Sequence, residues 1–125
     1  DRKTGNVNVH ELWSAVDTGV ALQPANVRAQ IESAAVWGVS ALRERLIYKD
    51  GVPQQSNFHD YPVLRMNEVP KITTKVIVTD NKPGGIGECG LPPVAPAVAN
   101  AVFDATGVRL RSVPFTSDKL KSLMA

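Results

Sequence analysis

The pattern of apolar and polar residues along the chain predicts three strands. In residues 6–16, β-branched and aromatic side chains partly alternate with polar ones, and this run ends at Asp17-Thr18-Gly19. Residues 71–79 form the clearest strand, because Ile, Val and Thr dominate them. A short final strand is expected over residues 110–115.

A long helix is predicted from about Pro24 to about Arg45, because apolar residues recur there at helical spacing. Pro24 suits the first turn of a helix, where its missing N–H costs no hydrogen bond. After this helix, the Asp-Gly pair at residues 50–51 lies between two short apolar runs and predicts a β-hairpin. Residues 54–66 are polar and aromatic with an internal proline, which indicates an irregular loop.

A second helix is expected from Pro93 or Pro96 to Ala105, with Gly107 in the position that glycine favours after a helix C-terminus. This helix is apolar nearly all round, and such helices are normally buried on every side. A domain of this size can hardly enclose it fully. The pattern therefore favours a fragment or a subunit whose missing partner covers the helix. The tail, residues 118–125, is expected to be a frayed helix.

These elements predict an α+β fold in which two helices pack on a small mixed sheet, and the length suits one domain, residues 1–125. The net charge of +2 comes from scattered residues with no basic stripe, which argues against nucleic-acid binding. No apolar run is long enough to cross a membrane. The single cysteine, Cys89, excludes an internal disulfide and a metal site built from thiolates alone. Trp13 and Trp37 are expected to be core or interface residues.

The start of the chain lacks an initiating Met, so we expect a processed subunit, a cloned domain or the ordered part of a longer protein. The opening residues, Asp1-Arg2-Lys3-Thr4-Gly5, are not expected to be a secretory signal. The residues alone leave the cellular compartment open.

Glu88 is the feature that most constrains the function, because it is the only charged residue between Lys82 and Asp104. Carboxylates are rarely buried without a partner. A lone Glu flanked by glycines, just ahead of an apolar helix, suggests either a helix cap or a reactive acid. The helix dipole would favour its ionised form and apolar neighbours its neutral form, and an acid held between these influences can act as a general base. Spacing alone favours the cap.

The run Gly84-Gly85-Ile86-Gly87 is similar to part of a phosphate-binding glycine loop, although the full dinucleotide fingerprint is missing. A tight turn is the alternative. Gln30 lies near the apolar face of the long helix, where most glutamines are boundary residues. His10 and His59 have no second metal-type ligand at helical spacing, so surface roles are expected for both and no metal ligand is predicted.

Several runs occur together in a specific order along nearly the whole chain: Asp17-Thr18-Gly19, residues 23–32, 56–62, 84–88 and 92–101, Ala105-Thr106-Gly107 and residues 109–112. In this combination the chain resembles the C-terminal part of the molybdopterin-binding large subunit of the xanthine dehydrogenase/aldehyde oxidase family. The greatest resemblance is to the isoquinoline 1-oxidoreductase beta-subunit branch. The fold implied is a C-terminal molybdenum-cofactor-binding domain of a bacterial enzyme.

The resemblance implies an oxidoreductase that hydroxylates an aldehyde or N-heteroaromatic carbon with oxygen derived from water. The cofactor implied is molybdopterin, in its cytosine dinucleotide form. Glu88 matches the family's general base and Gln30 a glutamine that hydrogen-bonds the pterin. Gly85, Ile86 and Gly87 are implied to contact the cofactor, and the two glycines leave room for a bulky metal centre. The isolated chain is expected to be inactive.

The partners implied are the remainder of the molybdenum-binding subunit and an iron–sulfur small subunit that carries the [2Fe-2S] centres. Relatives include exported and cytoplasmic forms, so bacterial cytoplasm and periplasm both stay open. The chain departs from the family at Ser33, where Gly is common, at Trp37, where a second Gln is common, and at Cys89, which we expect to be a small buried side chain. Two alternatives are a non-catalytic assembly domain that retains the fold and a simple nucleotide- or phosphate-binding module.

Overall fold

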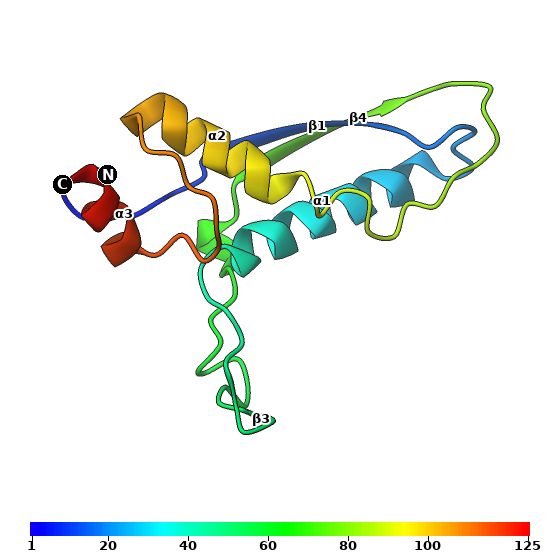
Figure 1. Ribbon diagram of the computed structural model, residues 1–125. Coiled ribbons are helices and arrows are strands. Elements are labelled where there is room, and N and C mark those ends of the chain that lie inside the picture. Colours follow the sequence, from blue (N-terminus) through cyan, green and yellow to red (C-terminus); the bar gives the residue numbers. More distant parts are fainter.

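The computed structural model describes all residues from 1 to 125. Its centre is a parallel pair of strands, β1 (Glu11–Asp17) and β4 (Lys71–Ile77), joined in register from Glu11 opposite Lys71 to Asp17 opposite Ile77. Every second residue of β1 is half-buried and the residues between are exposed, so one face of the sheet is covered. The helix α1 (Pro24–Ala41) runs along this pair and contacts β4 (Figure 1).

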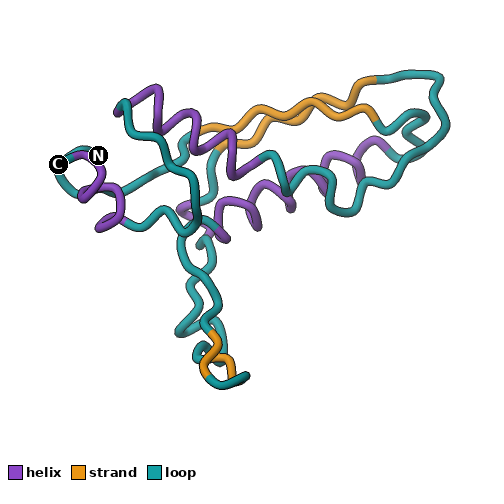
Figure 2. Tube along the Cα trace, in the orientation of Figure 1, coloured by secondary structure: helices purple, strands orange, loops and turns teal.

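A narrow arm projects from this body, as Figure 2 shows. It contains the two-residue strands β2 (Tyr48–Lys49) and β3 (Val52–Pro53), which pair antiparallel around Asp50 and Gly51. Both turn residues have positive φ, 52° and 79°, so the hairpin predicted from the Asp-Gly pair is confirmed. The return half of the arm is irregular, as predicted, until the short 3₁₀ helix η1 (Met66–Glu68) precedes β4.

The last two elements are α2 (Val94–Thr106) and α3 (Ser117–Met124). Gly107 ends α2 in the left-handed conformation, φ 78°, with its N–H donating to the carbonyl oxygen of Phe103 at 2.7 Å. This confirms the predicted stop. The expected helix in the tail is also present, because the hydroxyl of Thr116 accepts the N–H of Lys119 and caps α3.

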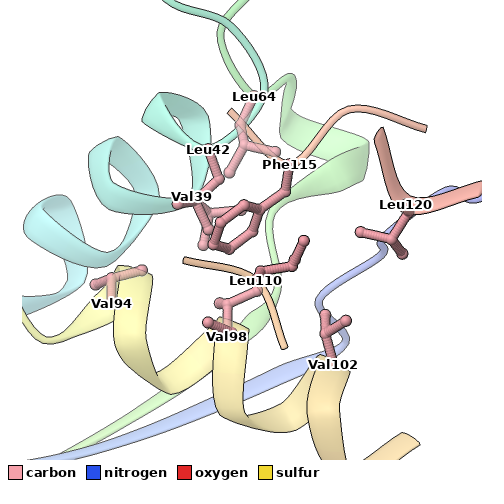
Figure 3. Close-up of a cluster of buried hydrophobic side chains, with 10 residues drawn as sticks. Val39, Leu42, Leu64, Val94, Val98, Val102, Leu110, Phe115 and Leu120 are labelled. Atoms are coloured by element: carbon pink, nitrogen blue, oxygen red, sulfur yellow. The ribbon is translucent and has the colours of Figure 1, made fainter. Parts of the chain in front are cut away.

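The core lies where the C-terminal half of α1 meets α2 and the chain that follows it (Figure 3). Gly38 makes this approach possible, because a Cβ added there would lie 2.7 Å from Cβ of Val94. Ten buried side chains form the cluster: Val39, Leu42, Leu64, Val94, Val98, Ala99, Val102, Leu110, Phe115 and Leu120.

The predicted strand over residues 110–115 is wrong, because no neighbouring strand is present for it to pair with. Leu110 and Phe115 are apolar because they fill the core. One backbone hydrogen bond fixes the segment there, from the N–H of Phe115 to the carbonyl oxygen of Leu42 at 2.6 Å.

Two predicted boundaries are also corrected. The first strand begins at Glu11 rather than at residue 6, because its partner β4 begins only at Lys71. The helix α1 ends at Ala41 rather than Arg45. There the hydroxyl of Ser40 accepts the N–H of Leu64 at 3.0 Å, and the chain turns into the arm.

The α+β fold is confirmed, with its parallel and antiparallel strand pairs forming two separate small sheets. The second helix is buried on one side only: Val94, Val98, Ala99 and Val102 face the core, whereas Ala97, Ala101 and Phe103 are exposed. None of the helices combines the length and apolar character that crossing a membrane requires.

Candidate functional site

The glycine-rich segment, defined as residues 84–90, connects the end of β4 to the start of α2 and is anchored at both ends. At its start the N–H of Gly84 donates to the carbonyl oxygen of Thr18 at 2.8 Å. A second bond, from the N–H of Val20 to the carbonyl oxygen of Asn81 at 3.0 Å, joins the same two loops. The loop after β4 is therefore held against the turn between β1 and α1.

The turn Asp17-Thr18-Gly19 forms this first anchor. One carboxylate oxygen of Asp17 accepts the N–H of Gly19 and the hydroxyl of Thr79, each at 2.8 Å. These two bonds, the Gly19 bond first, hold the pKa of the Asp17 carboxyl below its usual value. Gly19 has φ +69°, and a Cβ there would lie 2.3 Å from the carbonyl oxygen of Lys82. Only glycine fits where the two loops meet.

The second anchor is Gly90, which lies directly on α1. A Cβ added to Gly90 would stand 3.0 Å from Cδ1 of Ile31 and 3.1 Å from Cβ of Ala34. Gln30 lies one helical turn before Ala34 on α1, so the end of the glycine-rich segment meets the helix near the predicted pterin contact. Gly90 is not among the residues predicted for the site, although its place at the end of a glycine-rich run is a signal in the sequence.

The residues between the anchors are open to solvent. Gly85 and Gly87 are exposed and Ile86 is half-buried. A Cβ at either glycine would meet no atom within 4 Å. The backbone N–H groups of residues 85–88 donate to no group of the chain, whereas that of Gly84 does. A run of accessible backbone donors without side-chain bulk can bind an anion or a ring edge.

Glu88 is exposed in this open stretch and is not a helix cap. The helix α2 begins at Val94 behind the N-cap Pro93, with no side-chain cap hydrogen bond. The carbonyl oxygen of Glu88 accepts the N–H of Leu91 at 3.0 Å, which closes a turn before the helix. The ion pairs of the chain are Arg43–Glu68, His59–Asp60 and Lys71–Glu11, so no cation binds the Glu88 carboxylate. The cap that spacing favoured is wrong, because several residues separate Glu88 from the helix.

Gln30 is exposed on α1, and its amide makes no hydrogen bond within the chain. The fold brings this residue and the glycine-rich segment to one side of α1 through Gly90. Ser33 and Trp37, the two departures on this helix, are likewise exposed, and Trp37 retains 51% of its surface. Neither fills the core.

Cys89 is exposed, so the expectation that it is a small buried side chain is wrong. It lies between Glu88 and Gly90, in the turn whose Gly90 packs on the helix. The structure also excludes Trp13 from the core, since 70% of its surface is exposed.

The histidines are both exposed, as expected. Nε2 of His59 lies 3.5 Å from Oδ2 of Asp60 in the arm, far along the chain from the glycine-rich segment. The Asp60 carboxylate accepts the N–H groups of Asn57 and Ser56, which lower its pKa. No group of three or more His, Cys, Asp or Glu side chains is arranged to hold a metal ion.

One buried polar atom lies at the base of the candidate site. The hydroxyl of Thr18 is buried and has no hydrogen-bond partner in the chain, while the carbonyl of the same residue binds Gly84. An apolar hollow of 610 Å³ lies elsewhere, between residues 6–13 and α2, and contains none of the predicted site residues. The chemistry of the site therefore depends on an exposed loop rather than on this hollow.

Comparison with known proteins finds that the molybdopterin cofactor-binding domain family matches residues 1–70. The chain is 44% identical over 115 residues to isoquinoline 1-oxidoreductase subunit beta of Brevundimonas diminuta, covering 91% of this chain and 15% of the relative. It is 39% identical over 125 residues to a membrane-bound aldehyde dehydrogenase (pyrroloquinoline-quinone) of Gluconacetobacter polyoxogenes. This match covers 98% of this chain and 16% of the relative. The chain thus spans about a sixth of the length of these curated relatives.

Among solved structures, the aldehyde oxidoreductase of Desulfovibrio desulfuricans has a similar fold, with a TM-score of 0.84 and 24% identity. The match covers 98% of this chain and 14% of that one. The arrangement of strands, helices and arm is therefore a fold that a much longer polypeptide also contains.

Proposed function

Because this chain belongs to the molybdopterin cofactor-binding domain family, we propose that it is one domain, residues 1–125, of the molybdenum-binding subunit of a hydroxylase. The reaction proposed is oxidation of an aldehyde or N-heteroaromatic carbon with oxygen derived from water. The observation that carries the proposal is Glu88, an exposed carboxylate free of cations in an anchored glycine-rich segment.

The residues present fit a pterin cofactor with phosphate groups. Such a group needs hydrogen-bond donors for its phosphates and paired donors and acceptors for its ring edge. The free backbone N–H groups of residues 85–88 supply donors, and the amide of Gln30 supplies both kinds. Gly85 and Gly87 leave space for a bulky group to approach the backbone, since a Cβ there would meet nothing.

When bound, the molybdenum cofactor supplies the two-electron oxidation of the substrate carbon. In this proposal Glu88 accepts a proton at a carboxylate oxygen, as a general base does. Its place between two anchors suits that role, because a base must be held within hydrogen-bond reach of the proton that it removes. Gln30 binds and orients the pterin, and the backbone of Gly85, Ile86 and Gly87 approaches the cofactor.

The finer features of the assembly are also proposals. The cofactor is molybdopterin cytosine dinucleotide, and its remaining contacts and the substrate pocket come from the rest of the molybdenum-binding subunit. An iron–sulfur small subunit carries the [2Fe-2S] centres. The length of the relatives supports this division, because the chain spans 15% of one and 16% of another.

Replacement of the base tests the catalytic role. In the native assembly, Glu88→Gln should lower kcat by about 10²–10⁴-fold, the usual contribution of a general base, because the amide cannot accept the proton. Molybdenum and pterin contents should stay at the level of the unchanged protein. The matched control is Glu32→Gln, the same change at an exposed carboxylate on α1, which should leave kcat unchanged.

Near-normal turnover of Glu88→Gln with molybdenum still bound would end the catalytic assignment. Gln30→Ala separates binding from proton transfer, since it should reduce the pterin content. Metal analysis of the unchanged assembly discriminates the alternatives: full occupancy of partners without molybdenum supports a non-catalytic assembly domain. Mass spectrometry of the organic cofactor released from the same sample tests for a quinone, which occurs in the name of the Gluconacetobacter relative.

A further inference from the structure

The parallel sheet has an unpartnered edge. It consists of β1 and β4 alone, so β1 has a neighbour on one side only. Parallel strands normally occur in larger sheets that are covered on both faces. The carbonyl of His10 faces β4 and accepts the N–H of Lys71 at 2.9 Å. Because backbone groups alternate between the two edges of a strand, those of Glu11, Trp13 and Ala15 face the open edge.

The residues before β1 extend this edge without any pairing. The N–H and C=O groups of Val7, Asn8 and Val9 make no hydrogen bond within the chain. Val7 and Val9 are half-buried and Asn8 between them is exposed, which is the alternation of a strand. The segment is held at both ends, by a side-chain hydrogen bond between Ser117 and Asn6 and by the His10 carbonyl. The pattern that predicted a strand from residue 6 is thus present without a partner strand.

An apolar hollow of 610 Å³ lies beside this edge. The half-buried Val7 and Val9 line one wall, and Ala97, Ala101 and Ala105 of α2, spaced by four residues, line the other. The small alanine side chains leave space between the helix and the edge. A smaller hollow of 280 Å³ on the other side of residues 7–10 contains the Arg43–Glu68 ion pair, so the apolar side is the one suited to a strand.

The chain exposes more surface than a compact protein of its mass. The solvent-accessible surface of the chain is 8553 Å², whereas a monomeric protein of this mass has about 6,500 Å². The excess of about 2,000 Å² is more than twice the roughly 800 Å² that each partner of a standard complex buries. Part of this area belongs to the projecting arm, and the relatives, of which the chain spans 15% and 16%, favour a covering polypeptide from the same subunit over a second copy of the chain.

We propose that a β-strand from the remainder of the molybdenum-binding subunit pairs with residues 7–15 and fills the apolar hollow beside α2. This rests on the proposed function, in which this chain is one domain of a longer subunit. The added strand satisfies the backbone groups of Val7 and Val9, which face the open edge, and places small or β-branched side chains against Ala97 and Ala101.

Hydrogen exchange of the native assembly tests the pairing directly. The backbone amides of residues 7–15 that face the open edge should exchange at least about 100-fold more slowly than the exposed amides of residues 49–52 at the hairpin tip. Exchange as fast as that of the hairpin tip would overturn the proposal, because paired amides are protected.

Cross-linking identifies the occupant. A photo-reactive amino acid incorporated at position 8 should link to a peptide of the same subunit outside residues 1–125. A link to another copy of residues 1–125, or to a separate subunit, would overturn the assignment. Molybdenum content is measured on the same sample, so that failure of the proposed function and failure of the strand pairing can be told apart. Protected amides and a link within the subunit, found without molybdenum, support the strand pairing and contradict the proposed function.

A variant on α2 provides the matched control. Ala101→Lys places a charged side chain in the apolar hollow and should raise the exchange rate at residues 7–15 by about 10-fold or more. Asp104→Lys introduces the same side chain on the same helix outside the hollow and should leave that rate unchanged. Equal effects of the two changes would contradict the proposal.

Discussion

Asp17 and Glu88 are two carboxylates that differ in whether their oxygen atoms accept hydrogen bonds within the chain. Asp17 accepts a backbone N–H from Gly19, which closes the turn after β1, and a hydroxyl from Thr79, which joins β1 to the loop after β4. The side-chain carboxylate of Glu88 accepts no hydrogen bond within the chain and pairs with no cation. Asp17 is therefore structural, because its ionised form holds the first anchor. Glu88 is free for chemistry, because nothing within the chain occupies its oxygen atoms.

The anchor at Asp17 should depend on pH. Its pKa is lowered in the folded chain, so its ionised form stabilises the fold above the unfolded pKa of about 4, and this contribution is lost as the pH falls through the folded pKa. Asp17→Asn should lower the midpoint of thermal unfolding at pH 7. The difference from the unchanged protein should shrink as the pH is lowered below about 4.

Thermal unfolding of the full-length subunit at both pH values measures this effect. Asp104→Asn is the matched control, because this exposed carboxylate on α2 makes no hydrogen bond or ion pair in the chain, and its change should leave the midpoint unaltered. A difference at Asp17 that persists unchanged in acid would show that charge is not what holds the turn.

At the scale of elements, two glycines in close contact with other residues determine where the site lies. Gly38 lets α1 approach the start of α2, and Gly90 lets the glycine-rich segment lie on Ile31 and Ala34. Both contacts fix the path of the chain between β4 and α2. Glu88 is thereby held on the α1 side of the fold although the loop around it is open.

Filling the contact at Gly38 should destabilise the fold. A Cβ there would lie 2.7–2.9 Å from three side-chain carbons of Val94, whose β-branched side chain cannot rotate away freely. Overpacking costs about 1–3 kcal/mol, and alanine regains about 1 kcal/mol of helix propensity. Gly38→Ala should therefore lower the free energy of unfolding by up to about 2 kcal/mol, measured by urea denaturation.

The double variant Gly38→Ala/Val94→Ala should be more stable than the sum of the two single changes predicts. The smaller side chain at position 94 leaves room for the Cβ added at position 38, and that Cβ fills part of the space that Val94 occupied. Gly87→Ala is the matched control, since its added Cβ meets nothing, and its stability should equal or slightly exceed that of the unchanged protein. A Gly38→Ala variant more stable than the unchanged protein would contradict the close contact between position 38 and Val94.

At the scale of the whole molecule, the chain has a small core and a large surface. Only 20 of its 125 residues are buried, and large apolar side chains such as Leu22 and Met66 are exposed. The arm carries further exposed apolar residues, among them Tyr48, Val52 and Phe58. Ligand sites usually enclose most of their ligand, whereas Gln30 and Glu88 lie on open surface. Other polypeptide must complete the site that we propose.

Expression of the 125-residue chain alone tests this conclusion. The isolated chain should bind little or no molybdopterin and show no hydroxylase activity, because one open face cannot enclose the cofactor. Metal analysis and pterin fluorescence measure the first expectation, and assays with aldehydes and N-heteroaromatic compounds the second. The native assembly that contains the chain is the positive control. Stoichiometric molybdenum on the isolated chain would contradict the conclusion that other polypeptide completes the site.

The elements that the sequence predicted well are those governed by local interactions. Pro24 begins α1 and Gly107 ends α2 as expected, and the Asp-Gly hairpin forms, because backbone preferences of single residues act there. The misplaced elements depend on partners distant in sequence. Residues 110–115 have the composition of a strand, yet Phe115 is apolar because it packs in the core.

The sequence by itself determined the locally governed helices, the hairpin and the two paired strands, the family resemblance and the identity of Glu88 as an unusual carboxylate. Only the tertiary structure decided that Glu88 caps no helix, that Cys89 is exposed and that Gln30 shares one side of α1 with the glycine-rich segment. The physical reason is that propensities and periodicity act within a few residues. Exposure and proximity, in contrast, depend on contacts between residues far apart, such as those of Gly90 with α1 and of Gly84 with Thr18.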